Sequence, residues 1–167
     1  MDKAVPNNVQ AEQSVIASIL VDPELLPQAR AVLTGVDFFD NQCRYVWLSI
    51  TDLYDHKETV NQLTVWNELE VEGKLGFINR DSMSNWIAEL ESCYMIDSYI
   101  EVVKRNSIAR QLIHVADVIA KIAYENNLTA VTMVHRALTA LDGIEVKPVE
   151  NDGIKTAYKG LRRAKGS

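Results

Sequence analysis

The sequence has few of the residues that form tight turns. Its 167 residues include only seven glycines and four prolines. Sandwiches and barrels of β-strands join many short strands through turns that depend on these two residues. Their scarcity argues against such folds and favours long, uninterrupted elements.

Cysteine is equally scarce, and long apolar runs are missing. Cys43 and Cys93 lack the spacing of a zinc site or of a CxxC redox motif, so they are interpreted as reduced structural thiols. No apolar run approaches the ~20 residues of a membrane span. The first residues lack the charged stretch followed by an apolar stretch that marks a secretory signal peptide. We therefore expect a cytoplasmic protein without membrane contact.

Motifs of several enzyme classes are missing as well. The chain contains no GxxxxGK[ST] phosphate loop, no HExxH and no GxSxG elbow. His56, His114 and His135 are scattered along the chain, as helix-surface residues would be. Acids such as Glu68 and Glu70 are expected on solvated helix faces. The sequence therefore predicts that this chain alone is not an enzyme and binds no cofactor or metal.

Positive charge is sparse overall but concentrated at one end. The net charge of −6 argues against a generic nucleic-acid binder. Residues 153–167 nevertheless carry +5 and no acid, so the rest of the chain carries −11. Three interpretations of this tail stay open: a solvated linker end, a linker helix that docks on a neighbouring domain, or a weak, salt-sensitive contact with nucleic-acid phosphates. The basic residues of the tail are Lys155, Lys159, Arg162, Arg163 and Lys165.

Helical periodicity dominates what is present. Apolar residues recur at spacings of three and four, and glycines or capping residues separate the periodic stretches. We predict an all-α fold in which a compact head of about five short helices, residues 1–94, precedes a long antiparallel helical hairpin, residues 95–143. Residues 144–167 are predicted to be a linker and basic tail, either disordered or forming a short helix. The predicted helices cover residues 9–21, 23–33, 41–56, 63–73, 81–91, 96–125 and 130–141.

The long helix of the hairpin has two apolar stripes. One contains large aliphatic residues such as Ile108 and Ile119, and the other contains small ones such as Ala116 and Ala120. A single return helix can cover only one stripe, so either the head or a second chain must cover the other. We favour a second chain, because a helix of about 45 Å should extend beyond a head of short helices. The predicted interface residues are Ile108, Leu112, Val115, Ile119, Ile122, Val131, Val134 and Leu138.

Several ordered stretches resemble one known family. They are "AEQSVIASILVD", "VDFF", "CRYVWLSITDLYDHKETVNQLTVWNELEVEGKL" and "YIEVVKRNSIARQLI". In this order and spacing they resemble the N-terminal domain of replicative DNA helicases of the DnaB family, over residues 6–141. The chain departs from the family pattern where Cys43 replaces a histidine, where Asn61 replaces an aspartate, and where "GFINRD" replaces a pair of glycines.

The resemblance implies a helical head with a hairpin, in agreement with the periodicity, and it also implies partners. In the family this domain pairs through its hairpin, forms a ring of three dimers on the hexameric motor, docks the primase and influences loader binding. ATP and magnesium bind in the motor domain of the parent helicase. We therefore expect a non-catalytic assembly and docking domain. The alternatives are a stand-alone phage-type or mobile-element adaptor, a primase helicase-interaction domain, and a DNA-binding protein that acts through the tail.

Glu12 stands at the edge of the apolar stripe of the first helix, one turn before Ile16. The resemblance implies that the Ala–Glu–Gln start is a family feature. We expect a structural role, because the helix dipole favours an anion in the first turn. The predicted partner is Arg44 or Arg110, and the ion pair would fix the orientation of the first helix.

Overall fold

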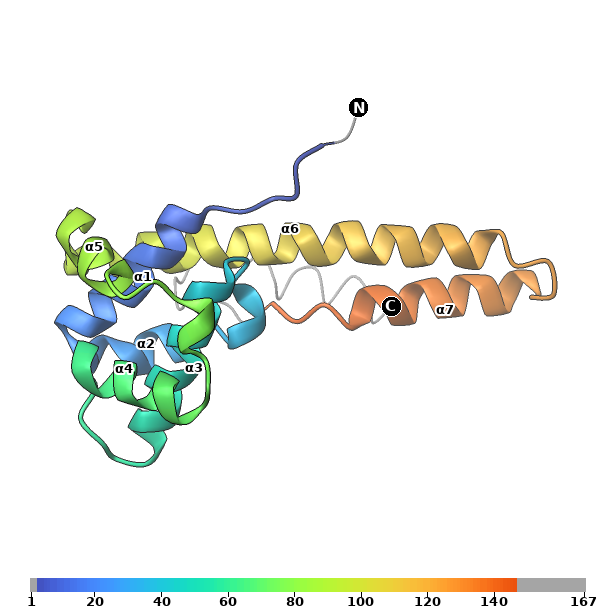
Figure 1. The fold of residues 1–167 in the computed structure, drawn as a ribbon. Helices are drawn as coiled ribbons and strands as arrows, with labels where there is room; N and C mark the ends of the chain where they lie inside the picture. The colour runs from blue at the N-terminus through green and yellow to red at the C-terminus, as the bar shows by residue number, and fades with distance from the viewer. Residues whose placement is uncertain (1–2, 147–167) are drawn as a thin grey trace.

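The computed structural model describes residues 3–146, which form helices joined by short connections (Figure 1). All regular structure in this range is helical, so the predicted all-α class is confirmed. Short 3₁₀ turns occur at Pro23–Leu25, Gly35–Asp37, Leu75–Phe77 and Cys93–Met95. The helices are α1 (Val9–Val21), α2 (Leu26–Arg30), α3 (Asn41–Asp55), α4 (Gln62–Val71), α5 (Ser82–Glu89), α6 (Ile96–Ala123) and α7 (Ala130–Asp142).

Local side chains explain where several helices begin. Asn8 caps α1 by accepting a hydrogen bond of 2.9 Å from the backbone N–H of Ala11, and Thr129 caps α7. Asn61 caps α4 by accepting from the N–H groups of Leu63 and Thr64. An asparagine caps a helix about as well as an aspartate. The departure from the family pattern at Asn61 therefore leaves the start of α4 intact.

The predicted helix over residues 23–33 is shorter than expected. A 3₁₀ turn over Pro23–Leu25 leads into α2, which ends at Arg30. Pro27 has no backbone N–H, so it cannot donate to the carbonyl of Pro23 as a continuous α-helix would require. The second proline therefore divides the segment into two short pieces.

The core of the head is built around α1, which packs against α3, α5 and α6. Val15, Ile16 and Ile19 are fully buried. Apolar residues cover most of the circumference of this helix, which is the pattern of a helix enclosed on several sides. Phe38 and Trp47 add large rings to the same core, with centroids 5.0 Å apart.

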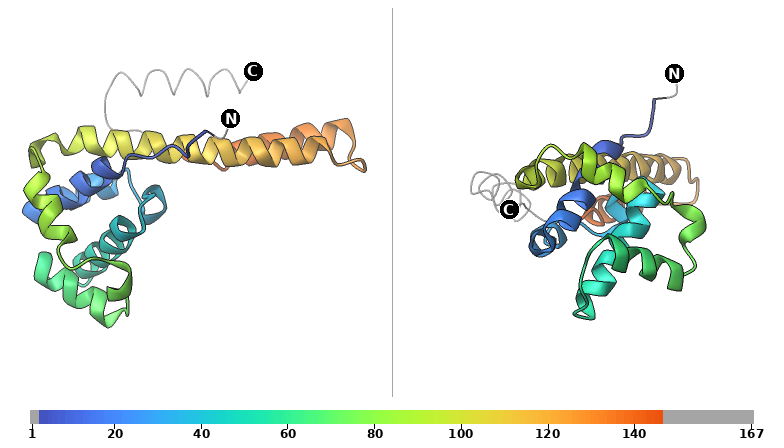
Figure 2. Two further views of the ribbon diagram at one scale, coloured as in Figure 1. Left: turned by 45° about the horizontal axis from the view of Figure 1, so that its top comes forward. Right: turned by 60° about the vertical axis from the view of Figure 1, so that its left-hand side comes forward.

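The long helix α6 belongs to both parts of the molecule. Ile96, Ile100 and Val103 in its first half are buried in the head core. Its second half extends beyond the head with α7 alongside, as Figures 1 and 2 show. The predicted division at residues 94 and 95 therefore separates two parts that share one helix. None of the helices in residues 3–146 combines the length and the apolar content needed to cross a bilayer.

Candidate assembly and docking surfaces

Glu12 is buried in the head, with 1% of its surface exposed. One carboxylate oxygen accepts from the backbone N–H of Phe39 and the other from that of Asp40, each at 2.9 Å. Asp40 is the N-cap of α3, so the carboxylate of α1 sits at the N-terminus of another helix. Burial raises the pKa of Glu12 above its ordinary value of 4.5, although the two N–H groups and Arg110 act in the opposite direction.

The two predicted arginine partners contact the same turn instead of pairing directly with Glu12. Arg44 donates to the carbonyl of Phe38 at 2.8 Å. Arg110 donates to the carbonyls of Asp37 at 2.7 Å and Pro6 at 2.8 Å. The expected ion pair is therefore corrected: the carboxylate binds backbone N–H groups, and the guanidinium groups bind backbone carbonyls. These backbone groups need partners because they are removed from water.

Asp37 is a structural acid that the sequence analysis missed. Its side chain is fully buried and accepts from the hydroxyl of Ser107 at 2.6 Å and from the ammonium of Lys104 at 3.0 Å. It also accepts from the backbone N–H of Thr34 at 2.8 Å. The cluster attaches the turn before α3 to the middle of α6. Asp37 lies in the "VDFF" stretch, which is one of the stretches that resemble the family. This resemblance was the one feature of the sequence that could have indicated a role for Asp37.

Two of the predicted interface residues lie inside the hairpin. Val115 and Ile122 are 9% and 5% exposed, on the side of α6 that packs against α7. On α7 the partly buried side chains include Met133, Ala137 and Ala140. Val115 and Ile122 therefore hold the two helices of one chain together, and we remove them from the candidate interface. Ile108 and Ile119 are half-buried and lie at the edge of the candidate interface.

The other predicted residues form an exposed apolar surface. Leu112, Val131, Val134 and Leu138 are 48%, 80%, 61% and 49% exposed. A shallow depression of about 480 Å³ runs along α7 and is lined by Val131, Val134 and Leu138, with Ala130 and His135. Ile113 and Leu141 are exposed as well and belong to the same surface, although the sequence analysis did not include them. The small residues Ala116, Ala120 and Ala123 of α6 are also exposed.

The exposed stripes of α6 and α7 lie on one side of the hairpin. Successive residues on a helix are separated by about 100°, and the centre of each stripe lies about a quarter-turn from the contact between the helices. Because the helices are antiparallel, the two rotations lead to the same side. The opposite side is polar: Arg136 pairs with Glu125 at 2.7 Å, and Lys121 pairs with Asp117 at 2.6 Å. We call the first side the apolar side of the hairpin, defined by Leu112, Ile113, Ala116, Ala120, Ala123, Val131, Val134, Leu138 and Leu141.

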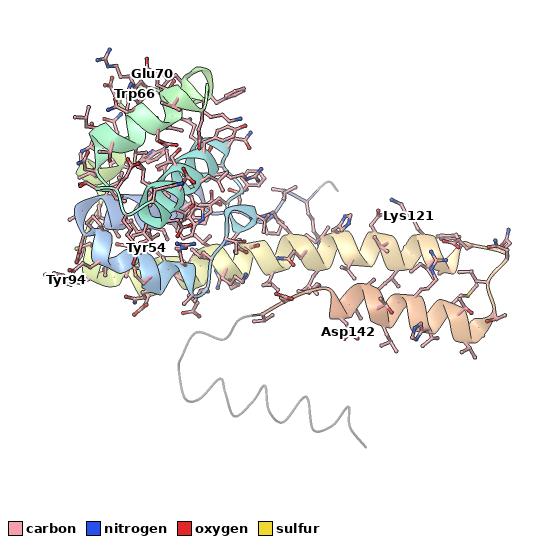
Figure 3. All side chains as sticks on the ribbon, turned by 90° about the horizontal axis from the view of Figure 1, so that it is seen from below. Tyr54, Trp66, Glu70, Tyr94, Lys121 and Asp142 are labelled. Carbon is pink, nitrogen blue, oxygen red and sulfur yellow. The ribbon has the colours of Figure 1, made fainter. Side chains whose placement is uncertain are left out.

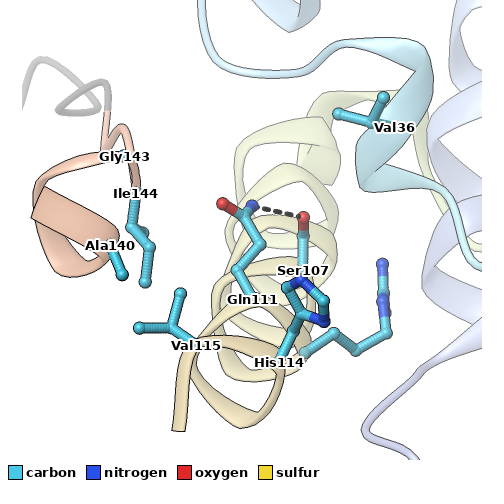
Figure 4. A pocket seen from close by; sticks show the side chains of 9 residues that line it. Val36, Ser107, Gln111, His114, Val115, Ala140, Gly143 and Ile144 are labelled. Carbon is cyan, nitrogen blue, oxygen red and sulfur yellow. Dashed lines mark hydrogen bonds between the residues drawn. The ribbon is translucent and has the colours of Figure 1, made fainter. Parts of the chain in front are cut away.

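A pocket of about 380 Å³ lies where the hairpin joins the head (Figure 4). Its polar lining includes His114 and Gln111, and Gln111 donates to the hydroxyl of Ser107 at 3.3 Å. Neither a carboxylate nor a thiol is among the lining side chains. The hydroxyl of Ser107 in this lining donates to Asp37 at 2.6 Å.

Within residues 3–146, the carboxylates of Asp52, Glu68 and Glu72 are the one group close enough together to hold a metal ion. They lie on α3 and at the C-terminal end of α4, and all three are at least partly exposed. The three histidines do not join a cluster of this kind in that range. Exposed acids gather often without a metal, so this arrangement alone assigns no ion.

The comparison with known families agrees with the fold. The family model described as the DnaB-like helicase N-terminal domain matches residues 4–105. The chain belongs to this family. The predicted resemblance is therefore confirmed.

Relatives of this DnaB-like domain are replicative helicases. The chain is 32% identical over 124 residues to the replicative DNA helicase DnaC of Bacillus subtilis, covering 74% of this chain and 27% of that protein. It is 26% identical over 125 residues to the replicative DNA helicase DnaB of Buchnera aphidicola, covering 72% of this chain and 26% of that protein. The chain thus spans about a quarter of the length of these relatives.

Solved structures share the fold of this DnaB-like domain. The N-terminal domain of DnaB helicase from Mycobacterium tuberculosis matches with a TM-score of 0.77 and 23% identity, over 83% of this chain and 99% of that one. A DnaB-like replicative helicase, described together with its interactions with primase, matches with a TM-score of 0.67 and 20% identity, over 93% of this chain and 35% of that one. These likenesses confirm the head and hairpin architecture.

The predicted nucleic-acid contacts of the DnaB-like chain lie outside the described residues. They are Lys155, Lys159, Arg162, Arg163 and Lys165.

Proposed function

We propose that this chain is the non-catalytic assembly and docking domain of a hexameric replicative DNA helicase. The observation that carries the proposal is the apolar side of the hairpin, in a chain whose family consists of such helicase domains. In this proposal, unwinding of the replication fork, with ATP and magnesium, belongs to a motor domain of the parent protein. The cytoplasmic location stays a prediction.

The apolar side of the hairpin suits a second copy of itself. Its α7 half carries large residues such as Val131, Val134 and Leu138, which are 80%, 61% and 49% exposed. Its α6 half carries the small residues Ala116 and Ala120. When two copies pair about a two-fold axis, the large residues of each chain can pack on the small residues of the other. Three such pairs would form the proposed ring of six.

A primase is the proposed docking partner, and a helicase loader is a second partner. The support is the fold shared with a DnaB-like helicase described with its interactions with primase. Docking would use the head, because self-association occupies the exposed side of the hairpin. A purified primase from the same genome should bind the paired chain with a defined stoichiometry in analytical ultracentrifugation.

Self-association is tested with a charged substitution and a matched control. Val134→Asp places a charge on the apolar side of α7 and should convert pairs to monomers in sedimentation experiments at tens of micromolar, because pairing would bury the charge. Thr139→Asp places the same charge on the polar side of α7 and should leave pairing unchanged. Circular dichroism should show equal helicity for both variants. A wild-type chain that sediments as a strict monomer would contradict the proposal.

A further inference from the structure

A second pocket, of about 210 Å³, lies on the head. It is found where α1 packs against α5 and α6, at the end of the head seen in Figure 1. The first turns of α1 form one wall. Glu89 and Glu91, at and just after the end of α5, form the second wall, and Tyr99 and Val102 of α6 form the third. We call this cavity the α1–α5–α6 pocket.

The charged side chains of the α1–α5–α6 pocket are both acidic. Among residues 3–146, no lysine, arginine or histidine lines it. In the same range, no ion pair within 4.0 Å includes Glu89 or Glu91. Glu89 is also the last residue of α5, so the negative end of that helix dipole adds to the field of the two carboxylates. The pocket is therefore suited to a cation.

The ring of Tyr99 decides which kind of cation fits best. Tyr99 is half-buried and packs against the head core, so its ring is held in place before any ligand arrives. A guanidinium group is planar, stacks on aromatic rings and donates two parallel hydrogen bonds to a carboxylate. An ammonium group is a compact point charge without this shape. Two carboxylates beside an aromatic ring therefore favour arginine over lysine.

Polar side chains on the α1 wall already have partners within their own helix. Asn8 accepts from the backbone N–H of Ala11 at 2.9 Å, and Ser14 donates to the carbonyl of Gln10 at 2.9 Å. Their bonds maintain the start of α1 and fix the shape of that wall. The carboxylates of Glu89 and Glu91 are the acceptors that a charged ligand can use without breaking these bonds.

We infer that the α1–α5–α6 pocket receives an arginine side chain of the protein that docks on the head. The inference rests on the proposed function, in which a primase docks there, and it adds the place and the chemistry of one contact. The guanidinium group would bind Glu89 and Glu91 and stack on Tyr99. Pairing through the apolar side of the hairpin uses none of these residues, so changes in the pocket should leave pairing unaltered.

Calorimetric titration of the full chain with the primase from the same genome tests the pocket. The double change Glu89→Gln and Glu91→Gln removes both charges and keeps the size of the side chains. It should weaken binding at least ~10-fold, because hydrogen bonds between charged groups are stronger than neutral ones. The same double change at Glu58 and Glu70, which are exposed elsewhere on the head, is the matched control. Figure 3 shows Glu70 at the edge of the head away from α6.

Two further variants test the kind of cation. Tyr99→Leu should weaken binding of the primase, whereas Tyr99→Phe keeps the ring and should preserve it; circular dichroism checks that both variants remain folded. Arginine-to-lysine changes over the surface of the primase should identify one position at which affinity falls. At that position, the change should cause no further loss when it is combined with Glu89→Gln and Glu91→Gln, because the contact is already removed.

Different results would overturn this inference and the proposed function. If the primase binds the pocket variant as tightly as the wild type, the arginine contact is wrong and docking of the primase on the head still holds. Equal losses in the pocket variant and in the control would mean that only the total charge of the head matters, which also overturns the inference. A wild-type chain that binds no primase would contradict both proposals.

Discussion

The head and the hairpin use apolar residues in opposite ways. In the head, α1 is enclosed by other helices of the same chain, and Val15, Ile16 and Ile19 have no exposed surface. In the hairpin, α7 has one neighbouring helix, and Val131 and Val134 remain mostly exposed. Exposed apolar residues that form a continuous surface mark an interaction site. The head therefore buries the apolar residues of α1 within one chain, whereas the hairpin leaves exposed the surface on which the proposed pairing depends.

The same contrast holds for charged groups. In the head, Asp37 and Lys104 form a pair whose side chains are 0% and 14% exposed. In the hairpin, Lys121 and Asp117 pair in solvent. A buried pair leaves an uncompensated charge when one member is removed, whereas water replaces the lost partner of an exposed pair.

The largest expected effect comes from breaking the buried pair. Asp37→Ala should lower the free energy of unfolding by about 3–5 kcal/mol, because Lys104 would be left without its counter-charge in the head. Asp117→Ala, on the same helix as Lys104, should leave stability unchanged within error. Urea denaturation monitored by circular dichroism measures both. Equal effects of the two substitutions would contradict the distinction between head and hairpin.

The next effect separates the inside of the hairpin from its apolar side. Ile122→Ala should cost at least about 2 kcal/mol of stability, because Ile122 is buried and its truncation leaves a cavity. Ile113→Ala changes the same side chain at a position that is 57% exposed. It should barely change the stability of the monomer but should weaken pairing in sedimentation. The opposite pattern would mean that the two stripes of α6 are assigned to the wrong sides.

A smaller effect is expected where α1 is attached to α3. Glu12→Ala should cost about 1–3 kcal/mol, because it leaves the backbone N–H groups of Phe39 and Asp40 without their acceptor. Glu101→Ala, at an exposed position of α6, is the control and should have no measurable effect. Urea denaturation at neutral pH measures the difference, and equal stability of the two variants would argue against the capping role of Glu12.

The pH dependence of this difference has a defined sign. Because burial raises the pKa of Glu12 above 4.5, the folded state binds the proton more tightly than the unfolded state. Proton binding by Glu12 therefore stabilises the folded state below pH 4.5. This stabilisation is lost as the pH rises through the raised pKa. The stability of the wild type relative to Glu12→Ala should therefore decrease over this interval. An increase would contradict the raised pKa.

The smallest effect concerns thiol reactivity and leaves stability untouched. Burial raises the pKa of the Cys43 thiol, which has no exposed surface, whereas Cys93 is half-buried. A thiol reagent should label Cys93 in the folded chain and reach Cys43 only after unfolding, because the thiolate is the reactive form. Mass spectrometry of the labelled chain checks the order, and early labelling of Cys43 would indicate that the head opens readily.

Much of the fold could be predicted from local patterns. The bounds of α1 agree with the predicted range of 9–21, and α6 begins at Ile96 as expected. Asn8 and Thr129 act as caps, because a cap depends only on residues within one turn. The apolar spacing of residues 23–33 predicted one helix, although the structure divides this segment. Pro27 indicates the division, because proline has no N–H group to donate within a helix.

The candidate site was less predictable. Spacing placed Val115, Ile122 and Leu112 in one stripe, but the first two are inside the hairpin and Leu112 is exposed. Which of these residues is buried depends on the side of α6 against which α7 packs. The periodicity of the sequence does not specify that side. The partners of Glu12 and the burial of Asp37 depend likewise on residues far away in the sequence.

The sequence by itself determined the helical class, the order and length of most helices, and the charge of residues 153–167. These follow from composition and from interactions within one or two turns. Only the tertiary structure decided which stripe of α6 is inside, that Glu12 binds the N-terminus of α3 rather than an arginine, and that Asp37 joins the head to α6. Those choices depend on competition among distant groups for burial and hydrogen bonds, and that competition is resolved only when the helices pack.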